Sequence, residues 1–371
     1  MSDEIFDIAV IGAGPAGAAA AVLLAGHQQR VVLVDEKKFP RKGASYGWLN
    51  TRAASVLQGL GPNVERHLEQ GFTNVIFHNA DFSKTAKPNF EEAAGFLIDR
   101  VSFTNDFVAA AIKAGATAKF GAAVSDIKLL ENSVRLIVEG GEAVESRLLV
   151  LASGRGGVLL DRAGFTREGG ASAMWTAQVD GDLKKPVGGE PRVIVVLGTD
   201  KLGSFGICCL RGRHVSISIN WLGEKSDAIT ALITICKLAY ERQVLPADFS
   251  VQAAGAELVR SPASLALDMD THVGKHSLVI GEAGGFVSAA SNEGIYPGMW
   301  SAQIATDVLL TALKGRQSQD ELMAFDAAWR MQMADYLRSP NTDHQFLLPL
   351  IFSNQPMADR MGAAIFSGEN I

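Results

Sequence analysis

Residues 8–26 read IAVIGAGPAGAAAAVLLAG, and this stretch decides the fold. The apolar residues 8–11 predict a short buried strand, and the alanine-rich residues 16–25 predict a helix. Pro15 fits the first turn of that helix, because the N–H that proline lacks has no partner there. The stretch approaches the length of a membrane span, but glycines interrupt it and the preceding residues 1–7 are acidic, unlike a signal peptide. We therefore expect a strand, a glycine-rich turn and a helix of a globular fold.

The turn has the spacing G-x-G-x-x-G at Gly12, Gly14 and Gly17. Gly12 permits a tight turn, Gly14 leaves room for a pyrophosphate, and Gly17 lets the helix pack closely on the strand. Residues 30–35 predict a second buried strand, which ends in Asp35 at the offset of an acid that binds a ribose hydroxyl. The pattern predicts a dinucleotide whose phosphates lie at the positive end of the helix.

Composition excludes several other classes of protein. The 371 residues are enough for about two domains, and 47% hydrophobic residues exclude a long disordered chain. The net charge of −6 argues against a nucleic-acid partner. Three cysteines exclude a disulfide framework, and we interpret the adjacent Cys208 and Cys209 as packing residues on opposite faces of a strand. His272 and His276, on either side of Gly274, read as loop residues, so we predict no metal site.

A second group of motifs lies in residues 279–305, VIGEAGGFVSAASNEGIYPGMWSAQIA. A strand end is followed by Glu282 and a glycine turn, and residues 292–295 precede a helix. Together with the form GAGPAG of the first turn, this segment resembles the GDAAG…GEGI pattern of the geranylgeranyl reductase family, within the wider p-hydroxybenzoate hydroxylase-like group. The sequence departs from that pattern in two places, with Glu282 for the usual aspartate and Asn292 for the usual glycine.

The resemblance implies a non-covalently bound FAD. It places Glu282 at the ribityl chain and the backbone of Gly294 and Ile295 at the pyrimidine edge of the flavin, where a helix N-terminus stabilises negative charge. It also places Arg100, before a helix predicted over residues 105–114, near the diphosphate. We predict no catalytic side chain, because the flavin carries the chemistry. The cofactor-binding candidates are Gly12, Gly14, Pro15, Ala16, Gly17, Asp35, Glu36, Arg41, Arg100, Val124, Ser153, Gly154, Gly281, Glu282, Gly294 and Ile295.

The resemblance covers roughly residues 5–330 and implies an α/β fold. A Rossmann-like FAD-binding domain is expected to be interleaved with an α+β substrate domain, made of an antiparallel sheet plus a helix, and followed by a C-terminal helical segment. We assign residues 1–75, 95–165 and 270–315 to the FAD-binding domain, residues 76–94 and 166–269 to the substrate domain, and residues 316–371 to the C-terminal segment.

The substrate domain shows a clear strand and helix pattern. Residues 215–221 alternate apolar and polar side chains, which predicts a half-buried strand, and residues 226–243 predict an amphipathic helix over the sheet. We interpret the polar side chains Ser216, Ser218 and Asn220 as the solvent face of this strand and a pocket role as the less favoured alternative. The candidates for an apolar substrate pocket near the flavin are Tyr46, Trp48, Phe205, Trp221, Tyr296 and Pro297, each equally compatible with a place in the core.

Family signatures for one particular substrate are absent from the sequence. Residues 205–211 (FGICCLR) stand where geranylgeranyl reductases carry Tyr-x-Trp-x-Phe-Pro and halogenases carry Trp-x-Trp-x-Ile-Pro. Halogenation also needs a lysine, for which Lys84 and Lys87 are available but in surroundings that do not match. The glycine loop at residues 153–157 lacks the Asp-Gly pair of aromatic hydroxylases, which weakens that interpretation.

We therefore predict an FAD-dependent oxidoreductase that acts on a small apolar molecule, with NAD(P)H or a separate flavin reductase as the electron source. The leading hypothesis is reduction of a C=C bond in a prenyl or isoprenoid-like substrate. A flavin-dependent monooxygenase of an aromatic or natural-product substrate is the main alternative, and a halogenase or an electron carrier are further ones. We expect a cytoplasmic protein of open oligomeric state.

The apolar residues 345–352 are too few to span a bilayer, so domain packing is favoured over membrane-surface contact, a dimer patch or a cap on the active site.

Overall fold

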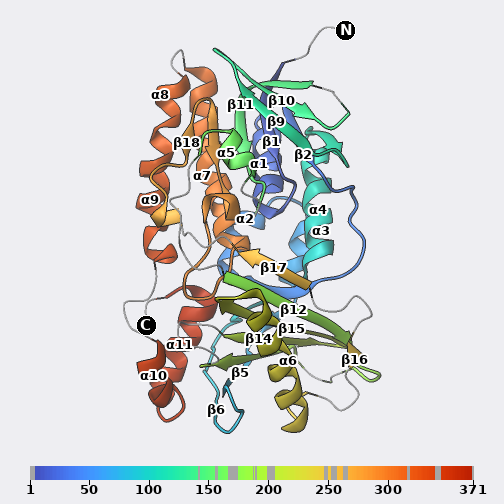
Figure 1. Ribbon diagram of the computed structural model, residues 1–371, viewed down its shortest axis with the longest axis vertical. Coiled ribbons are helices and arrows are strands. Elements are labelled where there is room, and N and C mark those ends of the chain that lie inside the picture. The colour runs from blue at the N-terminus through green and yellow to red at the C-terminus, as the bar shows by residue number, and fades with distance from the viewer. Residues whose placement is uncertain are drawn as a thin grey trace.

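The computed structural model shows two large sheets and a small one, with helices on their faces (Figure 1). The predicted α/β class, with a Rossmann-like part, an α+β part and a C-terminal helical segment, is confirmed. The predicted domain boundaries stay a prediction, and residues 155–157 of the glycine loop lie outside the described residues. The structure describes residues 5–140, 143–154, 158–165, 174–186, 188, 190–198, 205–245, 250–251, 257–261, 266–315, 318–338 and 344–369.

The first sheet contains β1 (Phe6–Ile11), the strand predicted from residues 8–11. β1 lies between β2 (Val31–Asp35) and β11 (Ala143–Leu151) and is parallel to both. The sheet order is β18-β19-β11-β1-β2-β8, and β10 and β9 continue it antiparallel from β11. The remaining strands are β8 (Thr117–Phe120), β9 (Val124–Leu129), β10 (Val134–Val138), β18 (Val273–Gly274) and β19 (Ser277–Val279).

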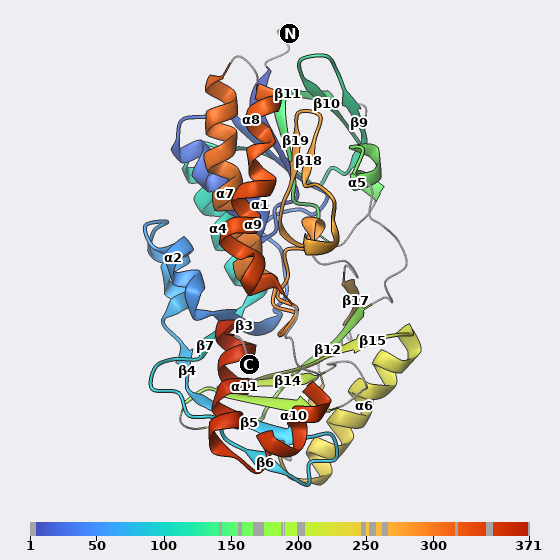
Figure 2. The same ribbon diagram turned by 90° about the vertical axis from the view of Figure 1, so that its left-hand side faces the viewer.

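Helices cover one face of the first sheet, and a short helix with a hairpin covers the other, so its central strands are buried on both faces and have continuous apolar runs. The helices of this half are α1 (Pro15–Gly26), α2 (Ala54–Leu57), α3 (Pro62–Glu65), α4 (Arg100–Lys113), α5 (Val158–Arg162), α7 (Ile295–Lys314), α8 (Ser318–Leu322) and α9 (Ala324–Leu337). α1, α4 and α7 form one core cluster with Ile8 and Val10, while α5 and the β9–β10 hairpin cover the opposite face. α8 and α9 lie along the outside of α7 (Figure 2).

Helix α4 begins at Arg100, earlier than the predicted start at residue 105. The Asp99 side chain accepts a hydrogen bond from the N–H of Val101 and so caps the helix. The cap places Arg100 in the first turn, next to the end of the preceding strand.

The second sheet has the order β16-β12-β15-β14-β13-β5-β6, and β17 also pairs with β12. Its strands are β5 (Asn74–Asn79), β6 (Thr85–Ala86), β12 (Met174–Asp182), β13 (Arg192–Leu197), β14 (Gly206–Arg211), β15 (His214–Leu222), β16 (Ser250–Val251) and β17 (Glu257–Ser261). The strand predicted at residues 215–221 is β15. The predicted amphipathic helix is α6 (Lys225–Glu241), which packs on Val215, Ile217 and Ile219.

The opposite face of the second sheet packs against a small sheet and the C-terminal helices (Figure 2). The small sheet has the order β3-β7-β4, from β3 (Tyr46–Asn50), β7 (Gly95–Asp99) and β4 (Gly71–Phe72), and the helices are α10 (His344–Ile351) and α11 (Gln355–Ser367). Within the apolar run 345–352, Leu347 and Ile351 are buried in the domain core, whereas Phe346 is 79% exposed. Domain packing therefore accounts for part of this segment.

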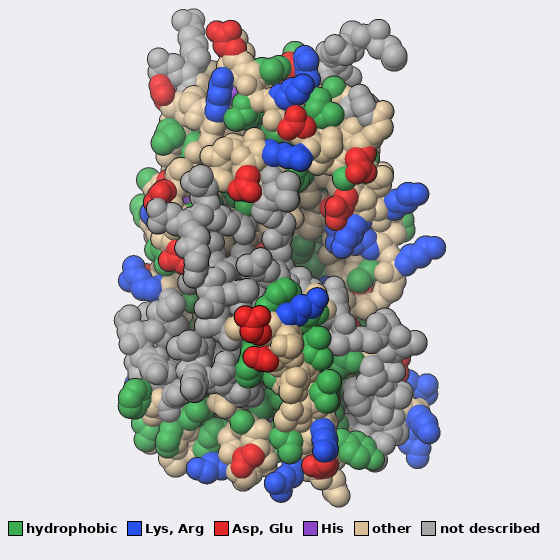
Figure 3. All heavy atoms as spheres, viewed as in Figure 1, with side chains coloured by type: hydrophobic (Ala, Val, Ile, Leu, Met, Phe, Trp, Pro, Cys, Tyr) green, Lys and Arg blue, Asp and Glu red, His purple; other side chains and the backbone are tan. Residues whose placement is uncertain are grey.

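The described helices and the described surface give two further facts. Among the described residues, no helix combines the length and the apolar character needed to cross a bilayer. On the face shown in Figure 3, Lys and Arg side chains are interspersed with Asp and Glu, so its described part carries no continuous basic stripe.

The glycine-rich turn is held by close backbone packing. Gly12 has a φ of +100°, and a Cβ there would collide with the carbonyl of Ala152. A Cβ at Gly17 would collide with the carbonyl oxygen of Gly12, as expected for the residue that lets α1 approach β1. A Cβ at Gly14 would meet nothing within 4 Å, so this position faces open space.

Gly17→Ala is therefore expected to destabilise the protein by about 2–3 kcal/mol, the upper range for overpacking, because the collision is with backbone. Urea unfolding of the purified protein measures the change. Gly26→Ala is the matched control, since a Cβ there also meets nothing within 4 Å, and alanine in a helix is favoured over glycine by about 0.5–1 kcal/mol. Equal stability of the two variants would contradict the packing argument.

Candidate functional site

Two adjoining cavities lie at the carboxyl ends of β1 and β11, where α/β sheets bind ligands. The outer cavity has a volume of about 720 Å³ and the inner cavity of about 330 Å³. Gly14, Ala152, Gly154 and Glu282 line both of them, so the two form one continuous trough. The inner cavity extends from the turn of the first sheet to the second sheet.

Most of the predicted cofactor residues line this trough. The outer cavity is lined by Gly12, Asp35, Glu36, Arg41, Val124 and Ser153, the inner cavity by Pro15, Ala16, Arg100, Gly294 and Ile295, and both by Gly14, Gly154 and Glu282. Gly17 and Gly281 have packing roles instead. Gly281 has a φ of +63°, and a Cβ there would approach the Cβ of Ala16 to 2.7 Å. Contact of each lining residue with FAD stays a prediction.

Asp35 ties the second strand to the glycine-rich turn. Its Oδ2 accepts a hydrogen bond of 2.7 Å from the N–H of Ala13 and forms an ion pair of 3.2 Å with Nη2 of Arg41. Two donors near this pair, Arg41 Nε and Ser153 Oγ, are buried and have no hydrogen-bond partner within the described part of the chain. Open space at Gly14 and unpaired buried donors beside it are what a bound diphosphate and ribose would satisfy, so the residues fit FAD.

Arg100 contributes a positive charge to the inner cavity. Its Nη1 donates to Oε1 of Gln178 over 3.1 Å, and its guanidinium occupies the space that a side chain at Gly47 would need. The predicted contact of Arg100 with the diphosphate stays a prediction. Gln178, which the sequence analysis missed, also donates to the backbone oxygen of Tyr46 over 3.3 Å and so links β12 to β3.

The polar face of β15 lines the inner cavity, and our interpretation of it as the solvent face was wrong. Ser216, Ser218 and Asn220 all lie on the cavity wall, joined by Thr176 of β12. The Thr176 hydroxyl donates to Oδ1 of Asn220 over 3.0 Å. Strand alternation correctly separated the two faces of β15, but α6 covers one face and the cofactor half of the molecule covers the other. No local pattern distinguishes that arrangement from exposure to solvent.

Of the six predicted substrate-pocket residues, Tyr46 and Trp48 line the inner cavity. The other four, Phe205, Trp221, Tyr296 and Pro297, are absent from its described lining, and contact of all six with a substrate stays a prediction. Phe205 belongs to the buried cluster beneath α10 and α11, and Trp221 packs on the α6 face. Tyr296 stacks on Trp300 with ring centroids 5.5 Å apart, and Pro297 is buried in α7.

The two adjacent cysteines point to opposite faces, as predicted. Cys208 belongs to the cluster under α6, whereas Cys209 belongs to the opposite cluster and also lines the inner cavity. Burial raises the pKa of the Cys209 thiol to about 12, and the nearby Arg100 only partly opposes this. Cys209 is therefore a neutral packing residue of the cavity wall at physiological pH.

At the N-terminus of α7, two backbone N–H groups already have a carboxylate acceptor, and contact of Gly294 and Ile295 with the flavin stays a prediction. Oε1 of Glu293 accepts hydrogen bonds from the N–H groups of Ile295, over 2.7 Å, and Tyr296, over 2.8 Å. Burial raises the pKa of the Glu293 carboxyl to about 7, the neighbouring Glu282 adds to the rise, and these two hydrogen bonds oppose it. Glu293 lines the inner cavity and is a functional candidate that the sequence analysis missed.

Asn292, which replaces the usual glycine, has a φ of +55°. This left-handed conformation favours glycine, and asparagine tolerates it better than most other residues. The replacement of glycine by asparagine at this position is therefore compatible with a left-handed backbone.

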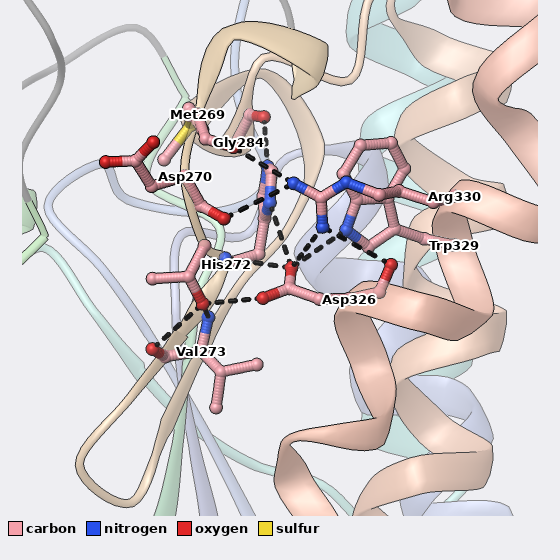
Figure 4. A network of polar contacts seen from close by, with 9 residues as sticks. Met269, Asp270, His272, Val273, Gly284, Asp326, Trp329 and Arg330 are labelled. Carbon is pink, nitrogen blue, oxygen red and sulfur yellow. Dashed lines mark hydrogen bonds and ion pairs between the residues drawn. The ribbon is translucent and has the colours of Figure 1, made fainter.

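A buried network supports the turn that carries Glu282 (Figure 4). His272 is fully buried, with Nε2 2.7 Å from the carbonyl oxygen of Gly284 and Nδ1 3.4 Å from Oδ1 of Asp326. Burial acts to raise the pKa of Asp326, but hydrogen bonds from His272, Thr271 and Trp329 outweigh it and hold the pKa below its usual range. Asp326 on α9 and Gly284 are thereby connected through a single histidine.

The fold and the trough at the ends of β1 and β11 define a nucleotide-binding flavoenzyme. The chain belongs to the family of FAD binding domains, whose model matches residues 6–332. It is an FAD-dependent oxidoreductase.

Similar proteins include reductases and halogenases. Digeranylgeranylglycerophospholipid reductase 1 of Methanosphaera stadtmanae is 25% identical over 83% of this chain and 76% of its own length. A geranylgeranyl bacteriochlorophyll reductase-like structure from Thermoplasma acidophilum superposes with a TM-score of 0.76 at 13% identity, over 99% of this chain and 97% of that one. The flavin-dependent brominase Bmp2 superposes with a TM-score of 0.73 at 16% identity, over 98% and 94%. The two structures share the fold of this chain.

The raised pKa of Glu293 makes stability depend on pH. The folded protein holds this proton more tightly than the unfolded chain does. The contribution of Glu293 to the free energy of unfolding is therefore fully present below its ordinary pKa of 4.5 and is lost as pH rises through about 7. Glu293→Gln is always neutral and keeps an oxygen for the two N–H groups. As pH rises from 5 to 8, the free energy of unfolding of the variant should increase by roughly 2–3 kcal/mol relative to that of the wild type. Urea unfolding across this range is the measurement, and parallel pH profiles would refute the prediction.

Asp326→Asn is expected to lower the free energy of unfolding by roughly 2–3 kcal/mol at pH 7. This is slightly less than the effect of breaking a fully buried ion pair. The pKa of Asp326 is lowered in the folded state, so its contribution is present above the ordinary pKa of 3.8 and is lost as pH falls below it. The difference between variant and wild type should therefore shrink in acid. Since the network supports the Glu282 turn, FAD titration calorimetry should also show weaker binding. Asp335→Asn, at an exposed position on the same helix, is the control.

Proposed function

We propose that this oxidoreductase reduces a C=C bond in a substrate that has an apolar body and a hydrogen-bonding end. The mixed wall of the inner cavity carries the proposal. Trp48, Ile207 and Cys209 line the cavity and belong to the buried apolar cluster that continues beneath α10 and α11. The hydroxyl and amide side chains of Ser218 and Asn220 face the same cavity. Ile207 of β14 pairs directly with Ser218 of β15, so this one mixed wall suits a substrate that has both a prenyl-like chain and a polar group.

The similarity to a digeranylgeranylglycerophospholipid reductase supports this proposal, because that relative is named for reducing an isoprenoid phospholipid. Bound FAD would supply the two-electron transfer, and the protein positions and shields it. The α1 N-terminus and Gly14 would receive the diphosphate, while Arg41 and Ser153 would donate to the nucleotide. Electrons would come from NAD(P)H or from a separate flavin reductase.

A monooxygenase of an aromatic substrate is the second candidate. The inner cavity, at about 330 Å³, is compact and has a row of polar side chains, which suits a small aromatic molecule with hydroxyl groups. A halogenase is less well supported. Lys84 lines a separate surface cavity beside Leu348, and no lysine is among the described residues of the inner cavity.

Stopped-flow reduction of the FAD-loaded protein distinguishes these candidates. We expect NADH or NADPH, or a flavin reductase, to bleach the flavin, and a prenylated lipid with a polar head group to reoxidise it without oxygen. Saturated product in mass spectrometry would accompany that step. A spectral C4a-adduct in the presence of oxygen, with a hydroxylated product, would overturn the proposed reductase in favour of the monooxygenase.

Ser218→Ala tests the polar wall. Loss of one hydrogen bond of about 0.5–1.5 kcal/mol should raise KM for the accepted lipid by about 2–13-fold, with FAD affinity unchanged. Trp221→Phe is the control, because Trp221 belongs to the same strand but packs on the α6 face. A KM effect of the same size in both variants would show that the polar wall does not bind substrate.

A further inference from the structure

The N–H groups of the first turn of α7 already have hydrogen-bond acceptors within the protein. Those of Ile295 and Tyr296 donate to Oε1 of Glu293, Pro297 has none, and that of Gly298 donates to the carbonyl oxygen of Gly294. The positive end of the helix is therefore matched by a carboxylate of the protein itself. This carboxylate lies on the wall of the cavity that suits the flavin.

A hydrogen-bond chain holds Glu293 in place from the other side. Oη of Tyr336, on α9, donates to Oε2 of Glu293 over 3.3 Å, and Nδ2 of Asn50, at the end of β3, donates to Oη over 3.1 Å. All three side chains are buried. Glu293 can exchange a proton here without losing its contacts, because a protonated Oε2 can donate to the phenol oxygen that it now accepts from.

The charged and titratable groups around Glu293 do not neutralise it. Glu282 faces it from the turn Gly281–Gly284, Tyr296 from α7 and Tyr336 from α9. Arg52, after β3, lies over the Tyr336 ring at 5.7 Å from its centroid rather than at the carboxylate. Arg100 supplies a positive charge to the same cavity and donates to Gln178, whereas Glu282 lies near Glu293. A further negative charge close to Glu293 therefore meets two carboxyl groups in a buried place where screening is weak.

We propose that Glu293 is a positioning residue that couples reduction of the bound FAD to uptake of one proton at the N-terminus of α7. When FAD is bound, its reduction by two electrons and one proton would bring a negative charge to the cavity that Glu293 lines. Glu293 then binds one proton from solvent, its carboxylate becomes a carboxyl group, and no covalent bond of the protein forms or breaks besides the O–H bond. Reoxidation of the flavin returns that proton. The proposal rests on the FAD binding of the family and is independent of which substrate accepts the electrons.

Proton uptake on reduction tests the proposal directly. The FAD-loaded protein is reduced anaerobically with dithionite in weak buffer, and a pH indicator measures the protons taken up. The same reduction of free FAD gives the protons that dithionite itself releases or consumes. At pH 7.5 to 8 the wild type should take up close to one proton more per flavin than Glu293→Gln, and the difference should vanish below pH 5. The midpoint potential of the wild type should show an inflection near pH 7 that the variant lacks. Glu145→Gln should behave as wild type, because Glu145 of β11 pairs with Arg135 of β10 and lines neither cavity of the trough.

Equal proton uptake by the wild type and Glu293→Gln would overturn the proposal. Tyr336→Phe provides a second test, because it removes a hydrogen bond that lowers the pKa of Glu293, so the inflection should move to higher pH. Infrared difference spectra of the FAD-free protein between pH 6 and pH 9 should show a carboxyl band that Glu293→Gln lacks; its presence in the variant would also contradict the assignment. Failure of the wild type to bind FAD would instead refute the cofactor itself, which separates the two outcomes.

Discussion

The close backbone packing around the first glycine-rich turn is the constraint on which the rest of the structure depends. Gly17 brings α1 onto the carbonyl of Gly12, Gly12 lies against Ala152 at the end of β11, and Gly281 lies against Ala16. Three segments far apart in the chain therefore meet at one point without side chains between them. Their meeting creates the trough, because the N-terminus of α1 is left facing open space at Gly14.

Charge in the trough is arranged in two different ways along its length. At the outer end, the carboxylate of Asp35 is neutralised by Arg41 and accepts a hydrogen bond from a backbone N–H, while Arg41 Nε and Ser153 Oγ have no partner among the described residues. At the inner end, Glu282 and Glu293 lie near each other, and Glu293 uses the helix terminus that would otherwise stabilise the flavin. The outer end thus suits an anionic nucleotide, whereas the inner end places two carboxyl groups, together with Arg100, around the cavity.

The cofactor half of the molecule was largely predictable from local sequence. The glycine spacing, the acid at Asp35 and the Glu282 turn each depend on backbone geometry within a few residues, and nearly all of these positions line the trough. The substrate half was less predictable. Phe205, Trp221, Tyr296 and Pro297 were chosen as apolar residues near the motifs, but apolar side chains in such a fold are mostly used for packing. Ser216, Ser218 and Asn220 were set aside as a solvent face because a polar face looks the same whether water or a cavity adjoins it.

The class of cofactor, the α/β fold and the order of the motifs could be predicted from local sequence, since these follow from glycines, strand periodicity and helix starts that act over short distances. What each face meets follows instead from the tertiary structure. It placed the polar row of β15 on the cavity, joined His272 to Asp326, and brought Asn50 and Tyr336 to Glu293 from two other elements. The physical reason is that burial and charge pairing depend on the elements opposite a residue, and those elements come from distant parts of the chain.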